Sequence, residues 1–137
     1  MDMKDIFAGF DASKYEHEAQ ERWGDTTAYQ EAAQRTKRYT ADDWTNYRAE
    51  QAAIYADMAA VMRAGKEPRD RDAVGIAERH RLSIDRWFYP CSSAMHRGLA
   101  EMYISDGRFS EAIDKHRDGL TAFLAAAIRA NADRAEG

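Results

Sequence analysis

The chain has 137 residues, of which 45% are hydrophobic and 32% are charged, a balance that predicts a single globular domain with one core. The single cysteine excludes a disulfide framework, and a net charge of −4 argues against direct binding to nucleic acid. No apolar run approaches the ~20 residues of a membrane span and the first residues do not resemble a signal peptide, so we expect a cytoplasmic protein without membrane contact.

Helices are predicted throughout the chain, after a flexible lead-in at residues 1–10, and they define one domain over residues 11–134. Alanine is abundant and valine occurs only at Val61 and Val74, which favours helix over strand. Glycine, proline and capping residues mark the helix ends. The predicted helices cover residues 11–23, 25–39, 41–64, 73–89, 94–104, 109–116 and 118–132.

Several helix ends carry specific capping patterns. Residues 40–43 resemble a capping box, in which Thr40 and Asp43 each bond the other's backbone amide. Gly65 is placed to stop the long helix that follows, and Pro90 to end the next one. A serine after Cys91 is expected to cap the helix beyond it.

The helices from residue 41 onward carry apolar residues at helical spacing. Because each apolar stripe must be covered by a neighbouring element, the helices are expected to pack around one core. The predicted fold class is therefore an all-α helical bundle.

Histidine and cysteine are the candidates for catalysis or metal binding. The four histidines, His17, His80, His96 and His116, lie on different segments without metal-ligand spacing, so we expect no metal and no cofactor. Cys91 and His96 could form a nucleophile and base, but no third orienting group or oxyanion site is visible. A half-buried cysteine is more often a small apolar residue, and we predict no enzymatic activity.

Aromatic residues make up 11% of the chain and include the consecutive run Trp87-Phe88-Tyr89. At about 100° per residue, three adjacent side chains span about 200° of a helix and cannot all face one core. At least one of them must meet another element or line a cleft. Rings with a polar edge suit large, flat ligands of mixed polarity, although they could also simply fill a small core.

Three segments are similar to the motifs of a known family. Residues 15–26 resemble the motif YEEEARERWGDT, residues 39–44 resemble YTKEDW, and residues 95–106 resemble MHRGLGEMYVSD. On these motifs the chain resembles the TipAS-type antibiotic-recognition domains, over about residues 10–132 and in the same order.

This resemblance implies a globin-like all-helical bundle with a deep ligand-binding cleft. TipAS domains form the C-terminal effector half of MerR-type transcription activators, and the N-terminal DNA-binding domain of those activators is absent from this chain. They recognise bulky, structurally varied antibiotics, with thiopeptides as the prototype. Binding activates multidrug-resistance genes or sequesters the drug. We therefore expect an antibiotic as partner, DNA contact only through the separate MerR domain, and a monomeric isolated domain.

Aromatic, methionine and histidine side chains are the expected ligand contacts, because rings stack on flat ligands and methionine adapts to varied shapes. Cys91 is the candidate for covalent attachment, since it matches the first of two cysteines in thiopeptide-binding members. The second of those cysteines, which captures the drug, falls at Gly98. The expected lining residues are Trp44, Tyr47, His80, Trp87, Tyr89, Met95, His96, Met102 and Tyr103.

Two other classes of function compete with the ligand sensor. A helical protein-interaction module would dock a partner through an exposed apolar stripe and would show a concentration-dependent mass. An enzyme using Cys91 and His96 would show rapid alkylation of the thiol at neutral pH.

Overall fold

The computed structural model describes residues 27–136, and within them the chain forms six α-helices and no strand. The predicted lead-in at residues 1–10 and the predicted helix at 11–23 lie outside the described residues. The all-helical fold class is confirmed. The helices are α2 (Thr27–Thr36), α3 (Ala41–Arg63), α4 (Arg71–Trp87), α5 (Ser93–Ser105), α6 (Gly107–Asp114) and α7 (Leu120–Glu136).

The predicted capping box forms at the start of α3. The Thr40 hydroxyl accepts the Asp43 amide at 3.2 Å, and the Asp43 carboxylate accepts the Thr40 amide at 2.9 Å. At the other end of α3, Gly65 adopts the left-handed conformation (φ 77°) that glycine reaches without steric penalty. Ser92 caps α5 by accepting the Met95 amide at 3.1 Å. These three caps confirm the sequence predictions.

Several helix boundaries differ from prediction by two or more residues, such as the end of α2 at Thr36 and the span of α4 from Arg71 to Trp87. The starts of α6 and α7 differ because polar side chains and one glycine set them. The Asp106 carboxylate accepts the Arg108 amide at 3.0 Å, so α6 begins at Gly107 instead of residue 109. The last helix begins at Leu120 instead of residue 118, because Gly119 before it is left-handed (φ 83°). Asp114, at the end of α6, then accepts the Thr121 amide at 2.8 Å and satisfies the first turn of α7.

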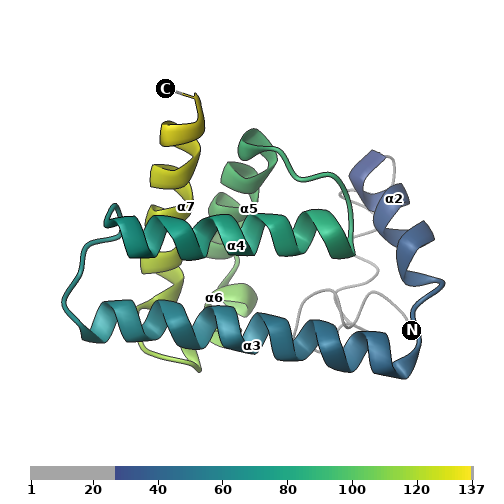
Figure 1. Cartoon of the computed structure of the whole chain (residues 1–137), viewed down its shortest axis with the longest axis horizontal. Coiled ribbons are helices and arrows are strands. Elements are labelled where there is room, and N and C mark those ends of the chain that lie inside the picture. The colour runs from purple at the N-terminus through teal and green to yellow at the C-terminus, as the bar shows by residue number, and fades with distance from the viewer. Residues whose placement is uncertain (1–26, 137) are drawn as a thin grey trace.

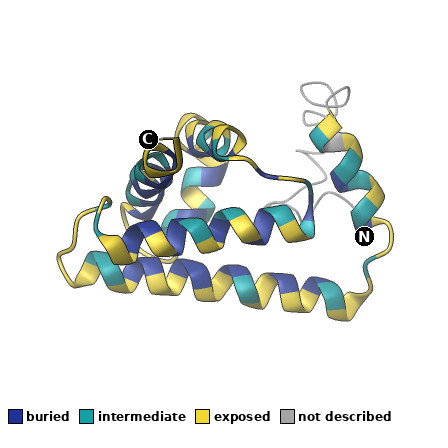
Figure 2. Ribbon diagram, turned by 45° about the horizontal axis from the view of Figure 1, so that its top comes forward, coloured by how far each residue is buried: buried dark blue, intermediate teal, exposed yellow. Residues whose placement is uncertain are grey.

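Helices α3 and α4 run antiparallel, side by side, and α5 and α6 lie behind them (Figure 1). Helix α7 crosses one end of this pair and packs on α3, α4 and α5. Buried residues face one another across the α3–α4 pair, and exposed residues lie on the outer sides (Figure 2). The main core forms at the α7 end around Met58, Leu120, Leu124 and Ile128, each fully buried.

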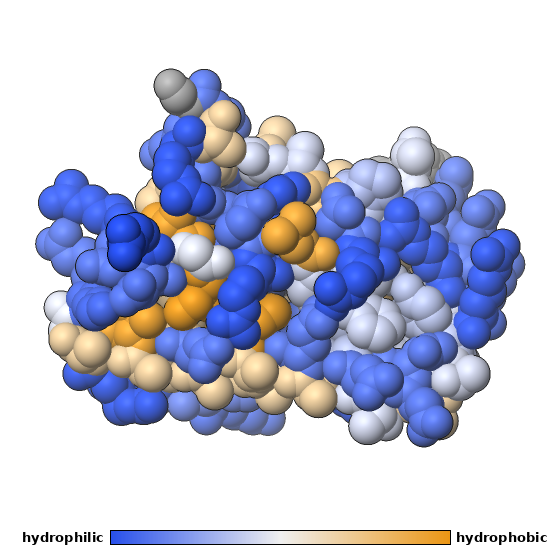
Figure 3. Space-filling model, in the orientation of Figure 1, coloured by the Kyte–Doolittle hydropathy of each residue, from blue (hydrophilic) through white to orange (hydrophobic). Residues whose placement is uncertain are grey.

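A second cluster of buried side chains lies at the opposite end of the α3–α4 pair. Trp44 and Tyr47 from α3 pack there with Ile84 and Phe88 from the end of α4. Apolar residues on the face seen in Figure 3 gather toward the end where α3, α4 and α7 meet, and the rest of that face is largely hydrophilic. The two clusters leave the middle of the bundle, between α3, α4, α5 and α6, as the place for a site.

Replacing Thr40 by Ala should destabilise the domain by about 1 kcal/mol, because the Asp43 amide would lose its capping acceptor. Thr45→Ala is the matched control, since Thr45 is an exposed residue inside α3 whose hydroxyl donates to the Ala41 carbonyl. Urea unfolding of both variants measures the difference. Equal stabilities would show that the capping box contributes nothing.

Candidate functional site

Aromatic rings from α3 and α4 form a contiguous cluster beside the middle of the bundle. The Tyr47 ring lies 5.0 Å from Phe88 and 5.7 Å from Trp87, in edge-to-face geometry. The Tyr39 ring contacts both Trp44 (5.4 Å) and Trp87 (5.5 Å). Edge-to-face pairs of this kind add to the stabilisation from burial alone. The cluster fixes the orientation of the Tyr47 and Phe88 rings, which also border a cavity.

The run Trp87-Phe88-Tyr89 contributes all three of its rings to the aromatic cluster. Trp87 is half-buried and its indole N–H donates to the Glu50 carboxylate at 3.0 Å. Phe88 is buried inside the aromatic cluster and Tyr89 packs against it, and both residues border the cavity. The three rings thus share one cluster, contrary to the prediction that they cannot all face one core, because α4 ends at Trp87 and the chain leaves helical geometry at Phe88. The prediction that at least one of them lines a cleft is confirmed.

A cavity of about 420 Å³ lies between α3, α4, α5 and α6. Its wall is mostly aromatic and aliphatic, with polar atoms from a few tyrosines, one glutamine, two histidines and the cationic side chains Arg48 and Lys115. This volume and lining fall within the range of small-molecule sites in proteins.

Polar side chains join α3 to α4 next to the cavity. The Gln51 amide donates to the Ser83 hydroxyl at 2.9 Å, and Ser83 in turn bonds Glu50. These polar bonds hold α3 and α4 at a fixed spacing behind the wall.

The expected lining residues fall into two groups. Five of them border the cavity: Tyr47, His80, Tyr89, Met102 and Tyr103.

The other four predicted residues lie elsewhere. Trp44 and Trp87 belong to the adjacent aromatic cluster, His96 lies behind His80, and Met95 is 36% exposed at the start of α5. Which of the nine residues contact a ligand stays a prediction.

Several cavity residues were missed by the sequence argument, among them Gln51, Tyr55, Phe88, Leu99, Phe109 and His116. A helical spacing would have found two of them, since Tyr47, Gln51 and Tyr55 recur every four residues and share one face of α3. Phe109 and His116 come from α6 and the turn after it, and no local pattern places them near α3. The His116 ring nevertheless lies 5.0 Å from Tyr55.

Two buried histidines meet at the cavity wall. His80 Nδ1 and His96 Nε2 are 2.8 Å apart, and each residue is 1% exposed. Burial lowers the pKa of His80, and burial together with the neighbouring His80 and Arg81 lowers the pKa of His96. Both rings are therefore neutral at pH 7, and one donates a single proton to the other.

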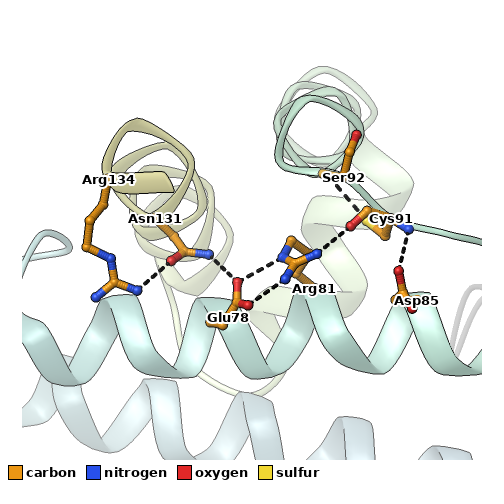
Figure 4. A network of polar contacts seen from close by, with 7 residues as sticks. All are labelled: Glu78, Arg81, Asp85, Cys91, Ser92, Asn131 and Arg134. Carbon is orange, nitrogen blue, oxygen red and sulfur yellow. Dashed lines mark hydrogen bonds and ion pairs between the residues drawn. The ribbon is translucent and has the colours of Figure 1, made fainter. Parts of the chain in front are cut away.

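Cys91 is held by a polar network that connects α4, α5 and α7 (Figure 4). Its amide donates to the Asp85 carboxylate at 2.8 Å, and its carbonyl accepts from the Arg81 guanidinium at 2.7 Å. Arg81 also binds Glu78, which accepts the Asn131 amide at 2.9 Å. Hydrogen bonds from Arg81 lower the pKa of Glu78 to about 2. The charged side chains of Arg81 and Asp85 thus hold the main chain of Cys91 in place.

The thiol of Cys91 itself is 1% exposed, and burial raises its pKa to about 12. A nucleophilic cysteine needs a thiolate and access to its target, and this thiol has neither at neutral pH. Its surroundings therefore give no support to covalent attachment or to catalysis at Cys91.

The described residues show neither a metal site nor a membrane-spanning helix. Within residues 27–136, no group of three or more histidine, cysteine, aspartate or glutamate side chains is placed to hold a metal ion. None of the helices in the same range combines the length and apolarity needed to span a bilayer.

Comparison with known proteins identifies relatives along nearly the whole chain. Residues 15–131 match the TipAS antibiotic-recognition domain family. The HTH-type transcriptional activator TipA of Streptomyces coelicolor is 41% identical over 130 residues, which cover 95% of this chain and 51% of that protein. The HTH-type transcriptional activator mta of Bacillus subtilis is 35% identical over 144 residues, covering 99% and 54%. The chain thus spans about half the length of the curated relatives it matches.

Solved structures agree with the sequence comparison. TipAS of Streptomyces lividans in complex with nosiheptide, from a thiopeptide antibiotic multidrug resistance system, matches with a TM-score of 0.90 at 40% identity, over 98% of this chain and 94% of that one. The antibiotic binding domain of a TipA-class multidrug resistance transcriptional regulator matches with a TM-score of 0.63 at 38% identity, over 69% and 100%.

The helices and the cavity define an all-helical domain built around an internal aromatic site. The match over residues 15–131 and the similarity to TipA show which kind of domain this is: the chain belongs to the TipAS antibiotic-recognition domain family. The family resemblance found in the sequence motifs is thereby confirmed.

Iodoacetamide should alkylate Cys91 in the native protein roughly a thousandfold more slowly than an ordinary cysteine at pH 7.5, because burial suppresses the thiolate. Mass spectrometry measures the rate, and the chain has no other cysteine to confuse it. The same protein unfolded in urea is the control and should react at the normal rate. Native alkylation as fast as the control would restore Cys91 as a nucleophile.

The buried histidine pair should make the domain less stable as the pH falls below about 6.5. The unfolded chain binds protons on both histidines below their usual pKa of 6.5, whereas the folded chain keeps both neutral because burial lowers their pKa. Stability therefore falls with falling pH, by up to about 1.4 kcal/mol per pH unit for each histidine.

Urea unfolding at pH 7.0, 6.0 and 5.0 measures this dependence. A His80→Phe variant should show a shallower slope, because it removes one of the two buried imidazoles. Equal stability at pH 7.0 and 5.0 would show that the pair is not buried in a neutral state.

Proposed function

We propose that this domain binds bulky antibiotics in the cavity between α3, α4, α5 and α6. The observation that carries the proposal is an aromatic cavity of about 420 Å³ inside a domain of the TipAS family. The related TipAS structure holds nosiheptide, a thiopeptide, which supports a drug of that size class as the guest. A cavity of this volume is at the smaller end of drug sites, so a large antibiotic would insert one part of itself there.

The chemistry of the wall supports a site that tolerates varied ligands. Tyr47, Tyr89 and Tyr103 offer flat faces for stacking, with a polar hydroxyl at the edge. Met102 is half-buried and can change rotamer to follow the shape of the guest. Binding by such a wall needs no reactive group, and we propose that the domain acts without catalysis and without a covalent bond to Cys91.

Regulation is the role that the relatives support. TipA and mta are HTH-type transcriptional activators about twice as long as this chain. We propose that the domain reports drug binding to a MerR-type DNA-binding domain, or sequesters the drug when no such domain is attached. The net charge of −4 fits a domain that does not itself contact DNA. A role beside DNA would place it in the cytoplasm.

Among the described residues, exposed apolar side chains give little support to a protein-interaction module. The large exposed ones are Leu82 on α4 and Met95 and Ile104 on α5. Met95 and Ile104 are nine residues apart, and at about 100° per residue they point to opposite sides of α5. They do not form one stripe on which a partner helix could dock.

Tryptophan fluorescence should show saturable quenching when the protein is titrated with a panel of bulky antibiotics that includes thiopeptides. Met102→Ala should weaken the affinity for a confirmed ligand roughly tenfold, because buried contact with the cavity wall is lost. Met95→Ala is the matched control, since Met95 lies on the same helix but away from the cavity, and its affinity should not change. A flat response to the whole panel would refute drug binding, and equal effects of the two variants would refute this cavity as the site.

A further inference from the structure

His80 and His96 meet edge to edge at the wall of the cavity. Their ring centroids are 5.1 Å apart and their planes differ by 23°. Together with the 2.8 Å contact between His80 Nδ1 and His96 Nε2, this spacing fits two nearly coplanar rings joined by a hydrogen bond in their common plane. His80 comes from α4 and His96 from α5, so the pair also ties these helices together.

The hydrogen bond couples the proton positions on the two rings. A neutral imidazole carries one proton, so one nitrogen donates and the other accepts. If His96 Nε2 donates to His80 Nδ1, the proton of His80 is on Nε2, and the bare nitrogen of His96 is Nδ1. If His80 Nδ1 donates instead, His80 Nε2 becomes an acceptor and His96 Nδ1 carries a proton. The state of His96 therefore decides whether His80 Nε2 is a donor or an acceptor.

The surroundings of His96 Nδ1 favour the first arrangement. This atom is buried and has no hydrogen-bond partner among the described residues. A bare nitrogen is easier to leave unpaired in the interior than an N–H donor, because orphaned buried N–H groups are the rarer kind.

The second ring nitrogen of His80, Nε2, belongs to a side chain that lines the cavity. Its ring lies 6.0 Å from Tyr103 in edge-to-face geometry and 6.1 Å from Tyr55, and both tyrosines also line the cavity. His80 Nδ1 is used by His96, so Nε2 is the ring nitrogen available to a guest. The group is nearly fully buried, in surroundings where an unmatched polar atom is costly.

We infer that His80 Nε2–H is a fixed hydrogen-bond donor at the cavity wall, held in that tautomer by His96, and that the site selects aromatic ligands that present a carbonyl oxygen or another acceptor at this point. The inference rests on the proposed function, because it concerns the same cavity. His80 is the binding residue, and His96 is a positioning residue that acts through it. A ligand with a donor at this point would have to reverse both protons and leave an N–H unpaired at His96.

Side-chain NMR of the free, uniformly ¹⁵N-labelled protein tests the tautomer directly. Long-range ¹H–¹⁵N correlations at pH 7 should show a protonated Nε2 and a bare Nδ1 in both His80 and His96. A protonated Nδ1 in either ring, or exchange between the two tautomers, would overturn the inference. This measurement needs no ligand and no variant.

Two flat probes of equal shape test the selection. The first, 2-acetylnaphthalene, has a carbonyl oxygen where the second, 2-isopropenylnaphthalene, has a methylene group. Amide chemical-shift titrations give both dissociation constants. Their ratio should favour the ketone about three- to tenfold more in the unmodified protein than in His80→Phe, which keeps a flat ring but removes the donor.

Tyr103→Phe is the matched control, because it removes a hydroxyl from the same wall and should leave the ratio unchanged. A ratio that is equal in the unmodified protein and His80→Phe, or that falls in Tyr103→Phe instead, would overturn the inference. If both probes bind without the expected ratio, drug binding in this cavity stands and only the donor is refuted. If neither probe binds and the antibiotic panel also gives no response, the proposed function fails with it.

Discussion

The burial of one face of α7 holds the whole bundle together. Leu120, Leu124 and Ile128 are fully buried against α3, α4 and α5, helices that belong to distant parts of the chain. Each such side chain contributes about 1.5–3 kcal/mol by leaving water, which is large beside the net stability of a small domain. Because α7 fills only one end of the space between α3, α4 and α5, the middle of the bundle is left to α6 and to the cavity.

The cavity in turn depends on rings that are fixed from outside it. Edge-to-face contacts with Trp44 and Trp87 orient Tyr47, and the Gln51–Ser83–Glu50 bonds set the spacing of α3 and α4 behind the wall. A binding site is more selective when its wall is already arranged before the ligand arrives, because less order has to be created on binding. Residues that never border the cavity therefore contribute to its shape.

Helix caps could be predicted from the sequence where the two residues that form the cap are close together in the chain. The Thr40–Asp43 capping box, the left-handed Gly65 and the Ser92 cap each involve residues within a few positions of one another. Apolar periodicity also gave the helical class. The cap that Asp114 provides for Thr121 spans seven residues and two helices, and no local pattern indicates it.

The cavity was harder to predict because it depends on which stretch of each helix its neighbours leave uncovered. Met95 and Met102 are seven residues apart and share nearly the same face of α5, about 10 Å from each other along its axis, yet only Met102 borders the cavity. His80 and His96 were both expected to contact a ligand, whereas in the structure His80 borders the cavity and His96 lies behind it, hydrogen-bonded to His80. The tertiary structure therefore decides what each of these residues touches.

The network around Cys91 acts on main-chain atoms: Asp85 accepts its amide and Arg81 donates to its carbonyl. The side chain takes almost no part, apart from a weak bond from the sulfur to the Ser92 carbonyl. Position 91 can therefore exchange its side chain for another small one while the α4–α5 connection keeps its course, whereas a larger side chain would overfill the buried cluster that contains Cys91. In evolutionary terms, the course of the connection is inherited separately from the chemistry of this side chain, which only has to fit a small closed space.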